Sequence, residues 1–206
     1  MTFSVAVRDP SNNTLGIAIS TKLIAVGSLC PFIRYGAGAV CTQALVNPRL
    51  GPLILNRLAI GENAKEALNN VMANETDAKL RQVGVIDSLG GSFAYTGSDT
   101  HKYAGHKTGE NYSIQGKLLV SEDTLIAMEK VITTNTGWDL SELLLNALEA
   151  GQQAGGDRRG RQSAALLVHN DQVFPLVDLR VDEHPNPVIE LRRIFELAKR
   201  EGLFKY

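Results

Sequence analysis

The chain has 206 residues, 44% of them hydrophobic, so it can bury a full core, and we predict one compact domain over residues 1–206. The charges of its 21 basic and 22 acidic residues nearly cancel, which argues against nucleic-acid binding. The apolar stretches are shorter than the roughly 20 residues that a membrane span requires. With only Cys30 and Cys41 and no basic leader-like start, we expect a soluble, cytoplasmic protein without a disulfide framework.

The first half of the chain changes from strand to helix periodicity. Residues 3–8 and 15–20 flank a turn cluster at 9–13 and predict a hairpin, and strand-like runs follow at 24–29 and 37–42. Apolar residues then recur at helical spacing after Pro48. A second helix is predicted to begin at Asn63 and Glu66, which have the spacing of a capping box.

The second half repeats the alternation of hairpins and helices. Residues 82–87 and 92–96 predict a hairpin, 97–111 is a polar stretch, and 112–119 is strand-like. Helices are expected after Ser121 and Asp139, followed by a hairpin of 162–169 with 173–181 and a closing helix over 187–203. Because the strands arrive in hairpins, we predict an α+β fold, a four-layer αββα sandwich of two antiparallel sheets flanked by helices.

Several runs of residues along nearly the whole chain carry a resemblance to a known family. They are Thr2-Phe3-Ser4-Val5, Arg8-Asp9-Pro10, Thr42-Gln43-Ala44 with Asn47-Pro48, Gln82-Val83-Gly84-Val85, Ala104-Gly105-His106, Gln115-Gly116, and residues 155–165 and 177–182. With these runs the chain resembles the domain of unknown function ten-twenty-eight, an uncharacterised family of the N-terminal-nucleophile (Ntn) hydrolase superfamily. The resemblance implies a proteasome-like core and, if the protein is an enzyme, amide hydrolysis.

The resemblance also implies catalytic residues. Ntn hydrolases use a Thr, Ser or Cys at the mature N-terminus, whose free α-amine activates its own side chain. Thr2 fits this role once the initiator methionine is removed, although a Thr that merely begins an edge strand is the alternative. Asp157 and Ser163 are similar to the Asp and Ser that support the nucleophile's amine. Gln43, at the end of a strand and before a helix, is placed to stabilise an oxyanion together with backbone N–H groups.

One departure from proteasome-like enzymes concerns a lysine. Those enzymes place a lysine on the strand before the oxyanion segment, but no lysine occurs between Lys22 and Lys65. Either Lys22 takes this role from the neighbouring strand, or the catalytic logic differs, or the site is not catalytic.

The candidate substrate-binding residues are polar or small. The Gly/Arg loop at 155–163 contains three arginines, which predicts either of two roles. The arginines, Arg161 above all, bind an anionic ligand, or they pair with nearby aspartates. For the other candidates an ordinary structural role is the alternative. These candidates are Ser4, Lys22, His106, Gln115, Gly116 and Arg158.

These features predict an Ntn-type amidohydrolase acting on a small-molecule or peptide-like, acidic substrate. The alternative, from another class, is a ligand-binding protein that uses the same fold without turnover. We expect no cofactor and no metal, because the four histidines, at 101, 106, 169 and 184, lack metal-ligand spacing. We expect no nucleic-acid or membrane partner, and self-association into a homo-oligomer is left open.

Overall fold

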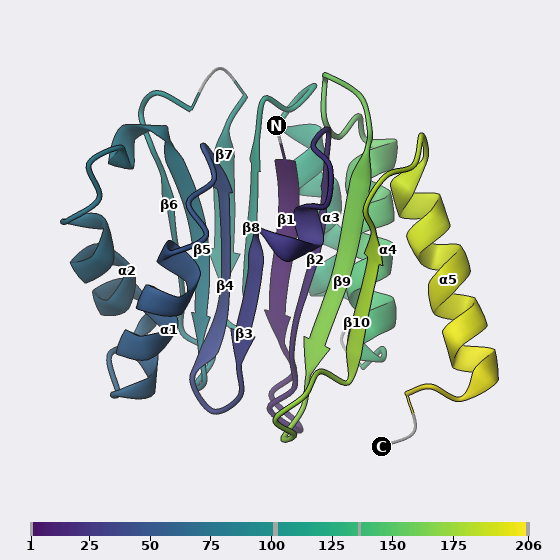
Figure 1. Cartoon of the computed structure of the whole chain (residues 1–206), viewed down its shortest axis with the longest axis horizontal. Helices are drawn as coiled ribbons and strands as arrows, with labels where there is room; N and C mark the ends of the chain where they lie inside the picture. Colours follow the sequence, from purple (N-terminus) through teal and green to yellow (C-terminus); the bar gives the residue numbers. More distant parts are fainter. Residues whose placement is uncertain (1, 101–102, 136, 205–206) are drawn as a thin grey trace.

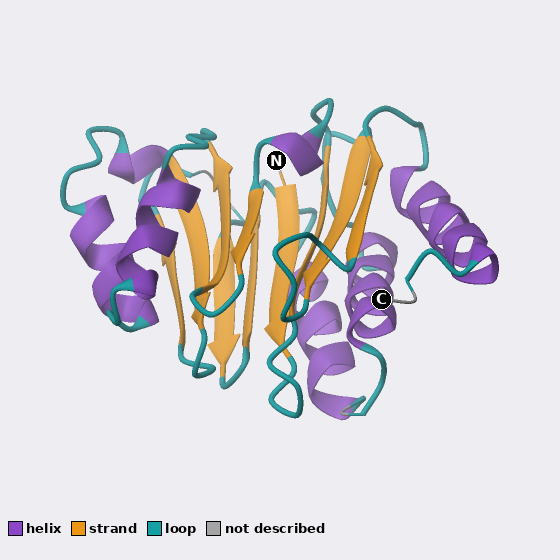
Figure 2. Ribbon diagram, turned by 60° about the horizontal axis from the view of Figure 1, so that its bottom comes forward, coloured by secondary structure: helices purple, strands orange, loops and turns teal. Residues whose placement is uncertain are grey.

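Two antiparallel sheets lie face to face in this protein, with helices on the outer side of each (Figures 1 and 2). The structure is a computed structural model that describes residues 2–100, 103–135 and 137–204. The order of layers, helices, sheet, sheet, helices, is the αββα sandwich predicted from the sequence.

The larger sheet has six strands in the order β10-β9-β2-β1-β8-β7. Their bounds are Thr2–Arg8 (β1), Leu15–Thr21 (β2), Gly105–Gly109 (β7), Tyr112–Lys117 (β8), Ser163–His169 (β9) and Val177–Val181 (β10). Because β1 pairs with β2 on one edge and β8 on the other, it is a central strand. Both neighbours therefore fix the position of its first residue, Thr2.

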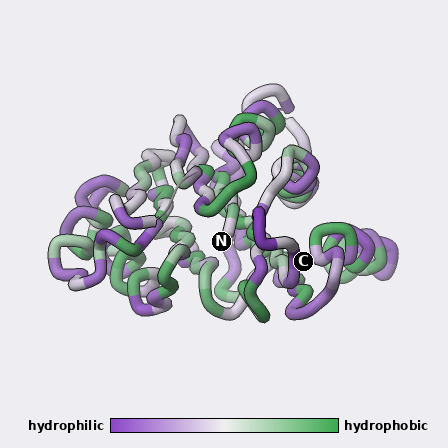
Figure 3. Tube along the Cα trace, turned by 90° about the horizontal axis from the view of Figure 1, so that it is seen from above, coloured by the Kyte–Doolittle hydropathy of each residue, from purple (hydrophilic) through white to green (hydrophobic). Residues whose placement is uncertain are grey.

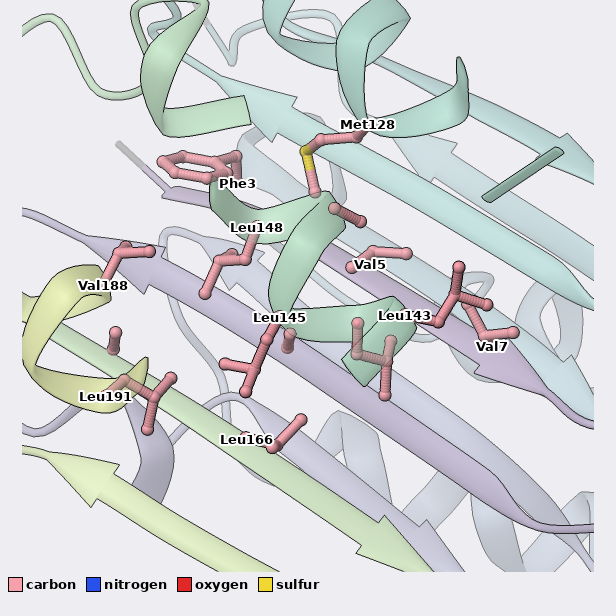
Figure 4. Close-up of a cluster of buried hydrophobic side chains, with 14 of the residues drawn as sticks. Phe3, Val5, Val7, Met128, Leu143, Leu145, Leu148, Leu166, Val188 and Leu191 are labelled. Carbon is pink, nitrogen blue, oxygen red and sulfur yellow. The ribbon is translucent and has the colours of Figure 1, made fainter. Parts of the chain in front are cut away.

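Three helices cover the outer face of the larger sheet: α3 (Asp123–Thr134), α4 (Leu140–Gln153) and α5 (Pro187–Glu201). Alternate residues of β1 pack against them, and Phe3, Val5 and Val7 lie in one buried apolar cluster with side chains of all three helices (Figure 4). By the two-residue period of a strand, Thr2 and Ser4 project to the other face, toward the second sheet.

The smaller sheet has four strands in the order β3-β4-β5-β6. Their bounds are Pro31–Arg34 (β3), Gly38–Ala44 (β4), Arg81–Asp87 (β5) and Ser92–Thr96 (β6), and helices α1 (Leu50–Ala59) and α2 (Ala64–Met72) cover their outer face. The apolar layer between the two sheets includes small residues such as Ala6, Ala39 and Cys41. Small side chains allow the sheets to approach closely around the buried polar residues described below.

Three predicted helix starts are confirmed, whereas α3 begins at Asp123 with Glu122, rather than Ser121, as its N-cap. Asn63 and Glu66 form a capping box at the start of α2, and the Asp139 carboxylate accepts the N–H groups of Ser141 and Glu142 at the start of α4. Pro187 occupies the first turn of α5, where its missing N–H costs nothing.

Four strand assignments differ from the prediction: one predicted strand is absent, two strands were missed, and one begins later. Residues 24–29 form no strand but contain the 3-10 helix η1 (Val26–Ser28), which follows Ala25 in a left-handed conformation (φ 54°). Strand β3, and strand β7 inside the polar stretch, were missed because both are short and β7 has no apolar alternation. Strand β10 begins at Val177 rather than 173, after Pro175.

Within residues 2–100, 103–135 and 137–204, no helix combines the length and the apolar character that a bilayer crossing requires.

Candidate functional site

A row of four polar residues crosses one end of the larger sheet. In the strand register Ser163 lies opposite Thr21, Thr21 opposite Thr2, and Thr2 opposite Lys117. Directly opposite residues of antiparallel strands project to the same face, with Cβ atoms about 4.5–5.5 Å apart. We call this end of the sandwich the Thr2 end; it also contains the last residues of β4 and lies around the N-terminus in Figure 3.

Thr2 is fixed by contacts with both sheets. Only 4% of it is exposed, and its Oγ1 lies 3.0 Å from Oγ1 of Thr21 on β2. Its carbonyl accepts a hydrogen bond of 3.2 Å from Nε2 of Gln43 on β4. The hydroxyl therefore lies between the sheets, next to a second hydroxyl.

The Gly/Arg loop continues the line of β1 beyond its first residue. The N–H of Val120, just after β8, donates to the carbonyl of Gly156 (3.2 Å), and Leu119 forms a single β-bridge with Asp157. On the other side, the N–H of Lys22, just after β2, donates to Oδ2 of Asp157 (2.9 Å). The segment 156–158 thus lies between the extensions of β8 and β2, so that Asp157 stands beside the start of β1.

Asp157 is a buried carboxylate that organises this loop. Its side chain is 1% exposed, its Oδ1 accepts the N–H of Arg159 (2.8 Å), and its Oδ2 forms an ion pair with the Arg159 guanidinium (3.2 Å). The hydroxyl of Ser163 accepts the N–H of Val26 and donates to the carbonyl of Leu23. Both residues therefore hold the loops that surround the start of β1.

Lys117 is the cation directly across from Thr2. It is partly buried, and its ammonium has no hydrogen bond or ion pair with another residue in the described part of the chain. Burial, and then the positive charge of Arg159, lower the pKa of Lys117 below its ordinary value.

A chain of buried glutamines leads from Thr2 into the space between the sheets. Nε2 of Gln43 also donates to Oε1 of Gln82 (2.7 Å), and Oε1 of Gln43 accepts the hydroxyl of Ser4 (2.8 Å). Since an amide has two N–H groups, both donors of Gln43 are engaged. Donation by this side chain to an oxyanion would require one of these bonds to break, so the geometry favours a role in holding Thr2.

Gln115 and Gly116, on β8, belong to the same buried network. Nε2 of Gln115 donates to the carbonyl of Cys41 (3.1 Å), and the carbonyl of Gly116 accepts from Nε2 of Gln82 (3.0 Å). These contacts link β8 to the smaller sheet.

The remaining predicted substrate-binding residues are exposed. His106 lies on β7 with Nδ1 2.9 Å from Oγ1 of Thr96, and Nζ of Lys22 lies 3.3 Å from the carbonyl of Arg161. The guanidinium of Arg161 donates to Asn186 (3.0 Å) and lines a cavity of about 190 Å³ beside α4 and α5. The N–H of Arg158 donates to the carbonyl of Leu118. The structure thus places Arg161 toward α5, whereas Arg159 pairs with Asp157.

The backbone is strained at the Thr2 end. Among the described residues of this end, four other than Gly or Asn have positive φ, and they lie between β2 and β3, at the last position of β4, before β7 and after β8. Such conformations cost about 1–3 kcal/mol each and collect at functional sites. The residues are Ala25 (54°), Ala44 (79°), Tyr103 (58°) and Leu118 (54°).

Sequence reasoning missed Thr21 and Lys117. No local motif distinguishes these two residues, because each gains its place from the pairing of strands distant in the chain. The ion pair of Arg159 with Asp157 is the alternative that the sequence offered for the Gly/Arg loop. The described residues contain no group of three or more His, Cys, Asp or Glu side chains that could bind a metal ion.

Comparison with known proteins identifies a matching family and solved structures that are similar to this chain. The model of a family described as "Family of unknown function (DUF1028)" matches residues 2–191. The crystal structure of protein SPO2555 from Silicibacter pomeroyi is 30% identical in sequence, with a TM-score of 0.89 over 96% of this chain and 89% of that chain. No curated protein matches.

Two further similar structures are of Anbu proteins. Anbu (ancestral beta-subunit) from Yersinia bercovieri and Anbu from Hyphomicrobium sp. strain MC1 are each 12% identical, with TM-scores of 0.44 and 0.42 over 99% of this chain and 97% of those chains.

Proposed function

The chain belongs to the family of unknown function DUF1028, and from this premise we propose that it is an N-terminal-nucleophile hydrolase that cleaves an amide bond through Thr2. The observation that carries the proposal is the position of Thr2. It begins a central strand, its hydroxyl faces the second sheet beside Thr21, and the Asp157 segment stands beside the start of its strand.

The chemistry needs only groups that Thr2 itself supplies once the initiator methionine is removed. The free α-amine takes the proton of Oγ1, Oγ1 attacks the substrate carbonyl carbon, and the amine returns the proton to the leaving nitrogen as the C–N bond breaks. The acyl ester on Thr2 is then hydrolysed by water, which the same amine activates.

The surrounding residues support this mechanism by holding the amine and the hydroxyl in place. Gln43 fixes the carbonyl of Thr2, and the buried carboxylate of Asp157, on the loop beside the start of β1, is the acceptor that we assign to the Thr2 amine. Ser163 holds the loop after β2. Such preorganisation is what converts a weakly nucleophilic hydroxyl into a catalyst.

A peptide-like, acidic substrate fits the side chains that this end exposes. Arg158 and Arg159 supply positive charge near Asp157, and apolar side chains are exposed on the adjoining loops. The charged groups suit a carboxylate, and the apolar ones suit side chains beside the scissile amide. The exposed apolar residues are Leu23, Ile24, Leu45, Tyr103 and Val120.

The test begins with the intact mass of protein purified from its own host, where we expect the initiator methionine to be absent. Protein beginning at Thr2 is then treated with an aliphatic β-lactone, whose strained ester transfers its acyl group to an activated hydroxyl. We expect the mass of one lactone to be added at Thr2. Thr2→Ala should abolish the labelling and any amide hydrolysis, and Thr2→Ser should retain both. Because Thr2 is buried and its hydroxyl is bonded to Thr21, Thr2→Ala should also lower the free energy of unfolding by about 1 kcal/mol while the protein remains folded.

Thr21→Ala is the matched control, because it removes the neighbouring hydroxyl from the same row. We expect this variant to be labelled, more slowly than wild type. Methionine retained in most molecules, or equal labelling of Thr2→Ala, would contradict the hydrolase and leave the fold as a binding protein without turnover.

A further inference from the structure

Thr2 can act as its own base only if its α-amine is uncharged near neutral pH, and an ordinary α-amine has a pKa of about 7.7–8.0. A buried carboxylate beside the amine, such as Asp157, favours the charged form. Some positive charge close to the amine is therefore needed to offset Asp157.

Lys117 is placed to supply that charge. It is the cross-strand partner of Thr2 on β8, and Gln115, two residues earlier, projects to the smaller sheet, as Thr2 does. Lys117 therefore projects to the same face as Thr2, and its side chain is long enough to reach the start of β1.

Two other cations at this end already have partners. The guanidinium of Arg159 pairs with Asp157, and Nζ of Lys22 reaches the carbonyl of Arg161. The charged groups on the Gly/Arg loop beside Lys117 are Asp157, Arg159, whose positive charge lowers the pKa of Lys117, and Arg158, whose N–H donates to the carbonyl of Leu118. On β7, Gly105 pairs with Gly116, the residue before Lys117.

We propose that the ammonium of Lys117 keeps the Thr2 α-amine uncharged and stabilises the alkoxide that forms on Oγ1, acting through the nucleophile rather than on the substrate. This inference rests on the proposed function. It replaces Lys22, the candidate from the sequence, by a lysine on the opposite side of β1.

The physical cost of this arrangement supports the proposal. A partly buried ammonium without a partner is unfavourable, and burial lowers the pKa of Lys117, so the folded chain binds this proton less tightly than the unfolded chain. Below that lowered pKa the charge destabilises the fold. Lys117→Met should therefore melt at the same or a higher temperature than wild type at pH 7, whereas removal of a lysine with a purely structural role would lower it.

The decisive experiment titrates the Thr2 α-amine in protein that begins at Thr2. Acetic anhydride is applied at a series of pH values, and acetylation of the N-terminal peptide is quantified by mass for wild type, Lys117→Met, Lys117→Arg and Lys22→Met. We expect Lys117→Met to raise the midpoint by about one pH unit, which is a tenfold change in proton affinity. Lys117→Arg should remain near wild type, and Lys22→Met should match it.

Acylation by the β-lactone at pH 7 should slow about tenfold in Lys117→Met, in line with that shift. Identical midpoints in wild type and Lys117→Met would overturn the role of Lys117, even if Thr2 is acylated. Failure of the lactone to label wild type would instead refute the hydrolase. The amine titration would then still decide whether Lys117 sets the charge of the Thr2 amine.

Discussion

Both ends of the sandwich contain residues with positive φ, but the two ends place different residue types at these positions. At the end opposite Thr2, the left-handed positions of the turns are held by Asn13, Gly36, Gly90 and Asn111. Gly and Asn tolerate positive φ, so residue type and conformation agree there. At the Thr2 end the Gly/Arg loop also uses glycines, but four other left-handed positions in the described part of the chain are held by Ala25, Ala44, Tyr103 and Leu118.

The difference indicates where tertiary structure overrides local preference. A conflict between residue and conformation persists only when surrounding contacts enforce it, and such conflicts are expected at functional sites. The Thr2 end is therefore the active end of the molecule in our proposal, although a larger cavity of about 600 Å³, lined in part by Arg8, Tyr112 and Trp138, lies at the opposite end.

A buried aspartate at each end gives the sharpest test of this comparison. Asp157 accepts the N–H groups of Lys22 and Arg159, and Asp87 accepts those of Ala64, Leu89 and Gly91. Asp157→Ala and Asp87→Ala should each lower the free energy of unfolding by about 3 kcal/mol, measured by urea denaturation, because several donors lose their acceptor.

Only the change at the Thr2 end should affect the chemistry. In the folded fraction, Asp157→Ala should slow lactone acylation of Thr2 by about tenfold or more, while Asp87→Ala leaves it unchanged. Removal of the carboxylate also favours the uncharged amine, but we expect loss of the hydrogen bond that positions the amine to outweigh that gain. Equal losses in the two variants would mean that acylation reports overall stability and not the Asp157 segment.

Arg161 tests how far the site extends from Thr2. Because its guanidinium is exposed and bonded to Asn186, Arg161→Ala should change the free energy of unfolding by less than about 0.5 kcal/mol. If Arg161 binds a substrate carboxylate, Arg161→Ala should weaken the affinity for an N-acetylated acidic dipeptide roughly 10- to 100-fold in calorimetric titration. Arg161→Lys should not fully restore that affinity. A lowered melting temperature with undiminished affinity would make Arg161 a purely structural residue.

The smallest effects are expected from relieving the strained backbones. Ala25→Gly and Ala44→Gly should each stabilise the protein by about 0.5–1 kcal/mol in chemical denaturation, because glycine adopts positive φ without a Cβ clash. Asn13→Gly, the control at the opposite end, should stay within about 0.5 kcal/mol of wild type. Destabilisation by both alanine replacements would show that these positions store no strain.

The sequence by itself determined the order of hairpins and helices, the helix caps at Asn63 and Asp139, and through these the αββα layers. These features depend on periodicity and on hydrogen bonds between near neighbours in the chain, which local sequence encodes. The family resemblance added Thr2, Asp157 and Ser163 as site residues, and their chemical roles stay predictions.

Only the tertiary structure placed Lys117 opposite Thr2 and engaged both donors of Gln43. Register between distant strands has no local signal, since a shift by one residue would turn Lys117 to the other face of the sheet. Residues 24–29, predicted to be a strand, form none for a similar reason. The N–H of Ala25 donates to the carbonyl of Asp182, and Gly27 packs so closely on Ala165 and Arg180 that a Cβ would not fit, so contacts with distant residues decide the local conformation.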